Sequence, residues 1–261
     1  MRALRVLREV DLIAAEDTRR TARLLQHYSI ATPTTSLHEH NEHAKSASLI
    51  ARLQGGASIA LVSDAGMPLV SDPGAHLVRS ARAAGVQVQV VPGPSAVTAA
   101  LAGAGISGPY AFLGFPPRSG RERTQWLDKL GQATSEIPAV FFEAPHRIRR
   151  TIEDVGQLLG DRPIIVAREL TKIHEELVEQ PIFAWLRDHP ADTPDLGEHV
   201  VIVLPEAPKP IERPSDADIM AEVGRMIENL AMRPKDAAKA VAQRYGLSAR
   251  EVYALHTRQT E

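Results

Sequence analysis

The sequence contains no cysteine, and aromatic residues make up only 4% of its 261 residues. The absence of cysteine excludes disulfides, thiolate nucleophiles and zinc sites with Cys ligands. Because aromatic side chains are scarce, the cores must be formed by Leu, Val, Ile and Ala. No long apolar run occurs, and charges interrupt the apolar positions of residues 1–10. We therefore expect neither a secretory signal nor a membrane span, and predict a cytoplasmic protein.

Neither sign of charge dominates, because 30 Lys and Arg balance 32 Asp and Glu and leave a net charge of −2. Such a balance neither requires nor forbids a nucleic-acid partner, since the local distribution of charge decides. Basic residues gather at Arg19–Arg23, at Arg118–Arg123, at Arg147–Arg150 and at Arg233–Arg258. Each group is either a solvated surface or a contact for an anionic partner.

Apolar runs alternate with amphipathic stretches, which is the pattern of an α/β protein. The pattern predicts strands at Asp11–Ala15, Ser58–Ser63, Val86–Val91, Tyr110–Phe115, Ala139–Glu143, Ile164–Arg168 and Glu198–Leu204. It predicts helices at Ala3–Glu9, Thr18–Tyr28, Ala75–Ala84, Ser95–Ala104, Arg121–Leu130 and Pro145–Leu159, the last with Pro145 in its first turn. We expect an N-terminal α/β lobe at residues 1–108 and a second α/β lobe at residues 109–206.

The end of the chain has a different character, and residues 207–261 are predicted to form a linker and a C-terminal helical domain. Prolines make residues 205–214 a stiff connection, entered after a turn-rich segment at His189–Gly197. Helices are predicted at Ser215–Leu230, Pro234–Tyr245 and Ser248–Thr257. The tight turn between the last two indicates a helix-turn-helix-like arrangement.

Two loops of small residues follow predicted strands, at Asp64–Pro68 and at Pro92–Ala96. Ligands of open α/β sheets bind beyond the carboxyl ends of strands. Small residues there would let backbone amides approach a ligand, and Asp64 could accept a hydrogen bond from a hydroxyl or amino group. The alternative is that both segments are simply tight strand-to-helix turns.

Three further segments carry chemically active side chains. In His38–His43, His38 and His40 would share one face of a strand, but no second segment completes a metal site, so no metal is expected. Glu143–Arg147 and Arg168–Lys172 both follow apolar strands. These two segments suit an anionic substrate or a proton acceptor, or they form surface salt bridges.

Taken together and in order, several segments resemble the family of ribosomal small-subunit (16S) RNA cytidine 2′-O-methyltransferases, within the tetrapyrrole-methylase-like superfamily. The segments are Glu16–Arg19, Ser36–Asn41, Ser63–Gly74, Pro92–Ala96, Gly114–Arg118, Glu143–Arg147 and Ala167–Lys172. The similarity runs from Met1 to about Glu206, and the helical tail resembles the C-terminal helix-turn-helix domain of that family. The resemblance implies a homodimer of two-lobed α/β chains that modify 16S ribosomal RNA or the assembled small subunit.

The resemblance also implies roles for particular residues. S-adenosylmethionine would bind between the lobes, at Asp64, Ala65, Gly66, Met67, Ser95, Ala96, Phe142, Glu143, Ala167, Gly197 and Glu198. Glu169 and Lys172 are the candidate catalytic residues that would take the hydroxyl proton. RNA phosphates would be held by Arg19, Arg118, His146 and Arg147, with further contacts from the basic tail.

The chain departs from that family in two places. Family members usually begin further upstream, with a strand and a Pro-Ile-Gly-Asn-Leu loop that enters the cleft, whereas Met1 here already lies in the first helix. Glu179-Gln180 stands where the family commonly has Arg-Gly. Two other functions remain open: a small-molecule (tetrapyrrole) methylase of the same superfamily, or a non-catalytic RNA-binding remnant.

Overall fold

The computed structural model describes residues 1–190, 197–206 and 214–258. They belong to two compact units, Met1–Pro205 and Glu206–Glu261, each with its own hydrophobic cores. Most of the predicted linker at 205–214 and of the turn-rich segment at His189–Gly197 lies outside the described residues. The predicted boundary between two lobes at residue 108 falls inside the first unit and stays a prediction.

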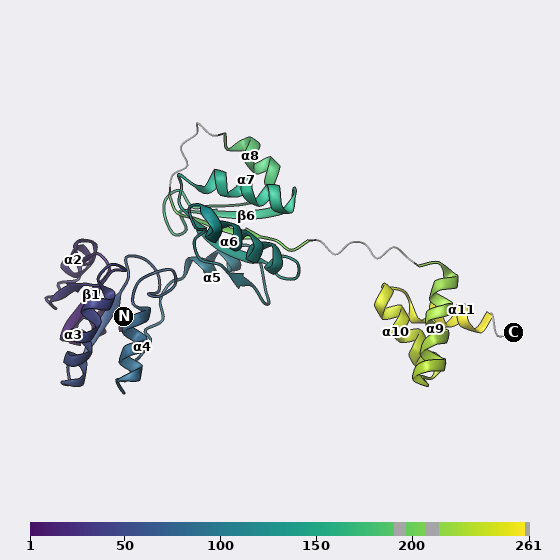
Figure 1. The fold of residues 1–261 in the computed structure, drawn as a ribbon, viewed down its shortest axis with the longest axis horizontal. Coiled ribbons are helices and arrows are strands. Elements are labelled where there is room, and N and C mark those ends of the chain that lie inside the picture. The colour runs from purple at the N-terminus through teal and green to yellow at the C-terminus, as the bar shows by residue number, and fades with distance from the viewer. Residues whose placement is uncertain (191–196, 207–213, 259–261) are drawn as a thin grey trace. The chain divides into compact units, whose positions relative to one another are not determined.

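The first sheet consists of three parallel strands in the order β2-β1-β3. The strands are Leu12–Ala15 (β1), Thr34–Ser36 (β2) and Ile59–Val62 (β3). Its helices are Arg2–Glu9 (α1), Thr18–His27 (α2), Glu42–Gln54 (α3) and Ala75–Ala83 (α4). Leu7 and Leu25 place α1 and α2 on one face, while Leu49 and Leu77 place α3 and α4 on the other (Figure 1). β1 is therefore buried from both sides, as central parallel strands are.

A buried carboxylate on α3 supports the beginning of α4. Gly74 precedes α4 with a φ of 119° and has no side chain that could cap the helix. Instead, Glu42 Oε1 accepts hydrogen bonds from the amides of His76 at 2.6 Å and Leu77 at 3.0 Å. The first amides of a helix have no partner within the helix itself. Here the neighbouring helix supplies the partner.

The strand predicted at Val86–Val91 does not form. The segment has alternating valines, which favour extended backbone, but a strand also needs a partner for its ladder hydrogen bonds. In the described part of the chain nothing pairs with it, and β3 pairs with β1 alone. Val88 and Val90 are consequently 40% and 63% exposed. The prediction was wrong because the residue pattern indicates the propensity of a segment for extended backbone, but not whether a neighbouring strand is present to pair with it.

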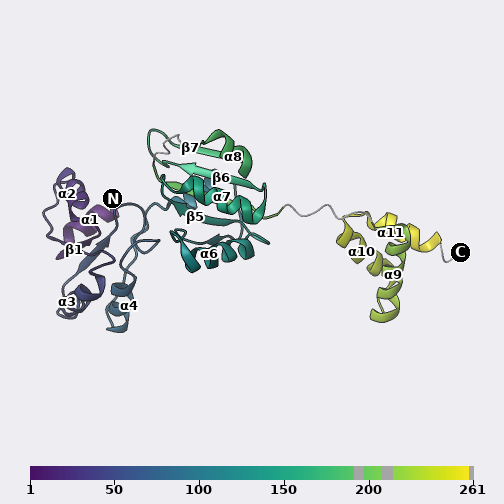
Figure 2. The same ribbon diagram turned by 45° about the horizontal axis from the view of Figure 1, so that its top comes forward.

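The second sheet has five strands in the order β4-β5-β8-β6-β7 (Figure 2). They are Ala111–Phe112 (β4), Ala139–Glu143 (β5), Pro163–Arg168 (β6), Glu176–Pro181 (β7) and His199–Val203 (β8). β4 runs parallel to β5, and the other neighbouring pairs are antiparallel. This sheet ends at β7, whose side chains alternate between exposed and half-buried over most of its length.

Helices cover both faces of the second sheet. They are Ala96–Gly103 (α5), Gly120–Ala133 (α6), Ile148–Leu159 (α7) and Ile182–Asp188 (α8). Trp126, Ile152 and Trp185 bring α6, α7 and α8 onto one face. Val97 and Leu101 place α5 on the other, although α5 falls in the range predicted for the first lobe.

Two local predictions are corrected. His38 and His40 do not lie on a strand, because β2 ends at Ser36 and the Asn41 side chain accepts a hydrogen bond from the His38 amide at 2.9 Å, which forms a turn. Pro145 is not in the first turn of a helix, because α7 begins at Ile148. The amides of Arg147 and Ile148 both donate to the Ala144 carbonyl, so a turn precedes the helix.

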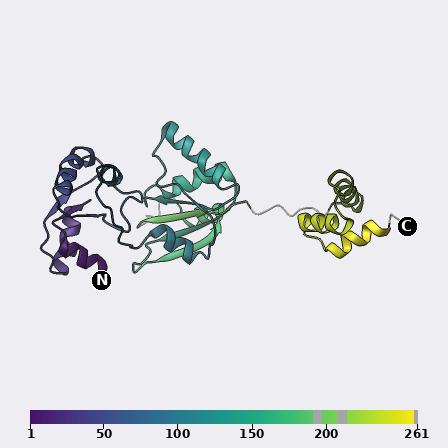
Figure 3. The ribbon, with the colours of Figure 1, turned by 90° about the horizontal axis from the view of Figure 1, so that it is seen from below.

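The described residues of the second unit form three helices, Asp216–Leu230 (α9), Pro234–Tyr245 (α10) and Ala249–Arg258 (α11), drawn in green to yellow in Figure 3. Ile219, Val241 and Val252 join them in one core. Gly246 follows α10 with a φ of 64°, so the helix ends at Tyr245 as predicted. Across the described residues, no helix is both long and apolar enough to cross a membrane.

Candidate functional site

Hydrogen bonds of Asp64 connect the segments that follow two strands of the first sheet. Because β1 and β3 are parallel neighbours, the residues that follow them meet at the same edge. Glu16 accepts a hydrogen bond from the Asp64 amide, and Asp64 Oδ1 accepts one from the Asp17 amide, both at 3.1 Å. Arg20 on α2 forms an ion pair with Asp64 Oδ2 at 3.3 Å. We call the edge formed by Glu16, Asp64 and their neighbouring loops the polar edge.

The loop after β3 contacts the loop before α5. Gly66 has a φ of +71°, and a Cβ there would lie 3.4 Å from the Pro94 carbonyl oxygen. A Cβ on Gly93 would lie 3.3 Å from the sulfur of Met67. The positive φ of Gly66 and the tight approach at Gly93 favour glycine at both positions. The structure thus brings together the two first-lobe loops in which the sequence predicts cofactor contacts, Asp64–Met67 and Ser95–Ala96.

Asp72 lies half-buried among other carboxylates at the polar edge. Burial, with the negative charges of Glu16, Asp64 and Glu198, raises the pKa of Asp72 to about 6, although a hydrogen bond with Ser63 opposes the rise. Glu198 immediately precedes β8, so loops of both sheets contribute charge. The edge therefore holds a surplus of negative charge, which a cationic ligand would relieve.

Strained backbone accompanies these charges. Residues other than glycine adopt positive φ in the two loops that carry Asp72 and Lys172: Leu69 (73°), Ser71 (67°), Glu169 (50°) and Thr171 (69°). Each such conformation costs about 1–3 kcal/mol and persists where surrounding contacts impose it. Strain of this kind gathers at functional sites, which supports both loops as parts of one.

Glu169 is fixed by contacts from three residues. Its Oε1 accepts hydrogen bonds from Lys172 Nζ at 2.7 Å and from the Glu198 amide at 3.2 Å. Gly197 has a φ of +88°, and a Cβ there would collide with the Glu169 carboxylate. The hydrogen bond from Lys172 lowers the pKa of Glu169 and raises the pKa of Lys172. At neutral pH the pair is therefore a carboxylate and an ammonium.

The other predicted cofactor residues lie in the second sheet. The Phe142 ring packs against Phe112, with 5.0 Å between ring centroids. Ala167 is fully buried in β6. The Glu143 carboxylate is also buried: it accepts a hydrogen bond from the Thr151 hydroxyl at 2.6 Å and pairs with Arg147 at 3.2 Å. These contacts hold the Glu143 side chain in the interior of the protein. Contact with a cofactor stays a prediction for Phe142, Glu143 and Ala167.

The residues predicted to hold RNA phosphates differ in their surroundings. Arg118 and His146 are exposed, and neither bonds to another residue in the described ranges. The Arg19 side chain is 90% exposed and pairs with Asp17 at 3.2 Å. Arg147 is half-buried and donates to the Pro116 carbonyl as well as pairing with Glu143. Arg118 and His146 are thus free to meet a ligand, whereas Arg147 already has partners within the protein.

The histidine-rich segment forms ring contacts. The rings of His38 and His40 lie 6.1 Å apart, and His43 lies 4.1 Å from His76. Within 1–190, 197–206 and 214–258, no group of three His, Cys, Asp or Glu residues is placed to hold a metal ion. These rings therefore give no support to a metal site.

Comparison with known proteins decides the family. The profile of the tetrapyrrole (corrin/porphyrin) methylases matches residues 1–184. The chain belongs to the tetrapyrrole methylase family. It is 43% identical over 249 residues to ribosomal RNA small subunit methyltransferase I of Pseudomonas aeruginosa, covering 92% of this chain and 85% of that protein. The proteins of the same name from Escherichia coli O157:H7 and Synechocystis sp. are 40% and 38% identical, covering 97% of this chain and 87% and 90% of their own lengths.

Solved structures share the fold of this methylase. Diphthine synthase superposes with a TM-score of 0.59 at 17% identity, covering 79% of this chain and 84% of that one. The methyltransferase CobJ superposes with a TM-score of 0.58 at 19% identity, covering 79% and 87%. The predicted fold class, two α/β lobes of the tetrapyrrole-methylase type with a C-terminal helical tail, is confirmed, as is the predicted family.

No site role was predicted for three residues of the methylase's polar edge, Glu16, Arg20 and Asp72, although each lies in a segment named above for its motif or its charge. Glu16 follows a strand directly, so the rule that points to Asp64 could also have found it. Arg20 and Asp72 have no local feature that distinguishes them from the other residues of those segments. Their importance arises from an ion pair and from burial among carboxylates that are distant in sequence.

Proposed function

We propose that this methylase transfers a methyl group from S-adenosylmethionine to the ribose 2′-hydroxyl of a cytidine in 16S ribosomal RNA. The observation that carries the proposal is the polar edge, found in a chain whose relatives at 37–44% identity are named ribosomal RNA small subunit methyltransferase I. The edge combines two loops beyond strand ends with a fixed carboxylate–ammonium pair. These are the parts that cofactor binding and proton removal need.

The residues at the polar edge fit S-adenosylmethionine, which when bound supplies a methyl group on a positively charged sulfur. A surplus of negative charge around Asp72 favours such a cation. The close approach of the loops at Gly66 and Gly93 would let backbone amides reach the polar groups of the ligand. This supports Asp64–Met67, Ser95, Ala96 and Gly197-Glu198 as the surroundings of the cofactor.

Glu169 would accept the proton of the ribose hydroxyl. During transfer an O–CH₃ bond forms, the S–CH₃ bond breaks, and the hydroxyl proton must pass to a base. Glu169 is ionised at neutral pH because the hydrogen bond from Lys172 lowers its pKa, whereas Lys172 is protonated and positions that carboxylate. Alignment of the reactants contributes up to roughly 7–11 kcal/mol, and a base adds about 10²–10⁴-fold.

RNA would be held around this site by exposed basic side chains. Arg19, Arg118 and His146 are exposed and could contact phosphates of 16S RNA, either free or in the assembled subunit. A homodimer, implied by the family resemblance, stays a prediction. Light scattering of the purified chain measures it.

The proposal predicts that Asp64→Ala weakens binding of S-adenosylmethionine by about tenfold, since the ties to the Asp17 amide and Arg20 would be lost. Isothermal calorimetry measures the affinity. Asp188→Ala is the matched control, because it also removes an aspartate from an ion pair, with Arg187. Equal affinity of the Asp64→Ala and control chains would remove Asp64 from the cofactor site.

Asp72 should make cofactor binding depend on pH. With a pKa of about 6, Asp72 is largely protonated at pH 5 and ionised at pH 7, so a cationic ligand meets more negative charge at pH 7. We expect affinity for S-adenosylmethionine to rise up to about tenfold between pH 5 and 7. Asp72→Asn should abolish most of this rise. A pH dependence that persists in Asp72→Asn would assign it to another group.

A methyl-transfer assay on unmodified small subunits tests the proposed function directly. Labelled S-adenosylmethionine is supplied with subunits from a strain that lacks this methylation, and nuclease digestion followed by mass spectrometry locates the methyl group. We expect it on a cytidine ribose. Transfer to an added tetrapyrrole instead would show a small-molecule methylase, and RNA binding without transfer would show a non-catalytic remnant.

A further inference from the structure

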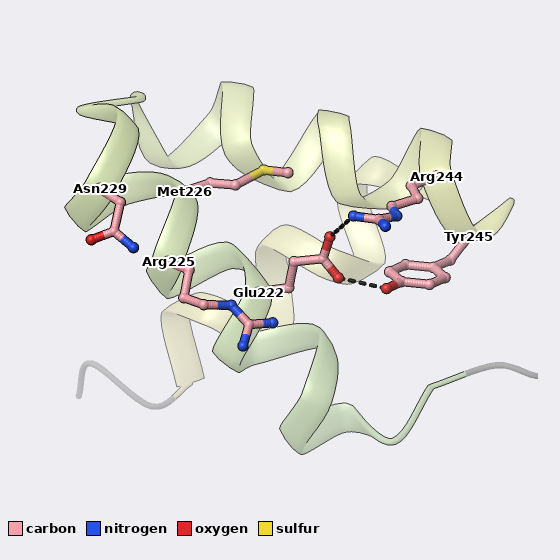
Figure 4. A pocket seen from close by; sticks show the side chains of 6 residues that line it. All are labelled: Glu222, Arg225, Met226, Asn229, Arg244 and Tyr245. Carbon is pink, nitrogen blue, oxygen red and sulfur yellow. Dashed lines mark hydrogen bonds and ion pairs between the residues drawn. The ribbon is translucent and has the colours of Figure 1, made fainter.

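The C-terminal unit has a pocket of its own (Figure 4). It is a shallow, open hollow with a volume of about 470 Å³. The residues that line it are Glu222, Arg225, Met226 and Asn229 on α9, and Arg244 and Tyr245 at the end of α10. The reaction proposed above uses none of them.

The four α9 residues share one face of the helix. Their spacing of three and four positions places them in a row along α9 (Figure 4). Ile219 and Val223, by contrast, are fully buried in the core of the unit. The pocket therefore lies beside the packed side of α9, and two of its residues, Met226 and Tyr245, also pack against that core.

Glu222 holds two side chains of α10 in place. Its Oε1 accepts a hydrogen bond from Arg244 Nη1 at 2.6 Å, and its Oε2 accepts one from the Tyr245 hydroxyl at 2.5 Å. The bond from Tyr245 lowers the pKa of Glu222, so the carboxylate stays charged. The Glu222 side chain is 11% exposed and that of Arg244 is 65% exposed. Arg244 is thus fixed at one end and presents its other N–H groups to solvent.

Arg225 adds a second positive charge close to Glu222. Its side chain is exposed, and none of the described residues forms a hydrogen bond or ion pair with it. The nearby Glu222 carboxylate is already neutralised by Arg244. Two guanidinium groups are therefore available to an anion. Guanidinium groups bind phosphate through paired N–H donors, which makes phosphate a suitable anion here.

The remaining residues suit a flat, partly apolar group. Tyr245 offers the exposed part of a ring that Glu222 orients, with the Arg244 guanidinium 5.8 Å from its centroid. Met226 offers a half-buried apolar side chain, and Asn229 offers an exposed amide. Unpaired bases in RNA are recognised by stacking on aromatic rings and by hydrogen bonds at their edges. A carboxylate-rich peptide would use the arginines and leave these three groups unexplained.

We propose that this pocket binds one nucleotide of single-stranded RNA. Its phosphate would contact Arg225 and Arg244, and its base would lie against Tyr245 and Met226 with Asn229 at the base edge. The choice of RNA rests on the proposed function. The pocket would then be a second RNA contact, carried by the C-terminal unit and separate from the residues that perform the transfer.

Fluorescence anisotropy of the full chain with a labelled single-stranded RNA of about twelve nucleotides tests the proposal. Arg225→Gln should weaken binding about five- to tenfold and reduce the slope of log K against log salt by nearly one. Arg82→Gln is the control, because it removes the same charge at an exposed residue that lies outside the pocket and outside the four basic groups that could contact RNA. It should change binding less than about twofold.

A second variant distinguishes recognition of the base from recognition of the phosphate. Asn229→Ala should weaken binding of the RNA but leave binding of inorganic polyphosphate, which has no bases, unchanged. Equal losses of RNA affinity in Arg225→Gln and Arg82→Gln would show general electrostatic attraction in place of a pocket and overturn the proposal. Competition by poly-glutamate as strong as that by RNA would also overturn it.

The methyl-transfer assay keeps the two proposals apart. Normal RNA binding by Arg225→Gln, together with transfer by the unsubstituted chain, would overturn the pocket and leave the proposed function standing. Weak RNA binding by Arg225→Gln, with no transfer by the unsubstituted chain, would support the pocket and overturn the proposed function.

Discussion

Glu169→Gln should slow methyl transfer by about 100-fold or more, because an amide cannot accept the hydroxyl proton. Glutamine has nearly the same shape, so the hydrogen bond from the Glu198 amide and the close fit against Gly197 would be kept. Affinity for S-adenosylmethionine and the melting temperature should change little. Turnover at saturating cofactor, measured with small subunits as substrate, gives the effect.

The Lys172→Met variant provides the matching pH experiment. Since the hydrogen bond from Lys172 lowers the pKa of Glu169, its removal should return that pKa upward. Loss of activity on acidification would then begin at a higher pH than in the unsubstituted chain. The pH profile of activity is measured at saturating cofactor, so that a change in cofactor affinity caused by the titration of Asp72 does not affect it. Glu169→Gln turnover above a tenth of normal, or an unmoved acid limb in Lys172→Met, would exclude Glu169 as the base.

A strand supplied along the free edge of β3 should raise the melting temperature by roughly 4–8 °C and speed methyl transfer. In the described residues β3 has one partner, and Val88 and Val90 are 40% and 63% exposed. An added parallel strand would give β3 ladder hydrogen bonds and could pair with Val86–Val91 on its other side. Covering these valines contributes about 2 kcal/mol, which corresponds to that shift in a unit of this size.

The change is made by extending the chain upstream of Met1 with a strand of β-branched residues and a Gly-Asn loop that leads into α1. An extension of equal length made of Gly and Ser is the control, since it adds chain without strand propensity. Calorimetric melting and turnover are compared between the two forms. Equal melting temperatures would show that the β3 edge accepts no strand.

Runs of buried residues were predictable from the sequence. β5, β6 and β8 lie close to their predicted bounds because nearly every side chain in them is buried, which yields continuous apolar segments. α3 was not predicted. Its buried residues are Glu42, Ser46 and Leu49, so two of the three that face inward are polar and the apolar periodicity is broken.

The candidate site also has features that the sequence predicts and features that only the folded chain reveals. Asp64 could be selected because it directly follows a strand, and position after a strand is visible in sequence. The state of Asp72 depends on Glu16 and Glu198, which reach it only through the folded chain. The same holds for Glu169, whose restraint by Gly197 requires two loops to meet. Sequence therefore predicts where site loops begin, and tertiary contacts decide how their groups are charged and held.

The Glu42 carboxylate that receives the His76 and Leu77 amides makes two helices of the first sheet mutually dependent. If α3 detaches, the first turn of α4 loses its acceptor, and those amides become open to solvent. Hydrogen exchange at His76 and Leu77 would therefore report the docking of α3, which lies on a different stretch of chain. The two helices should open together as one cooperative unit, with equal protection factors at the α4 amides and at the amides of α3.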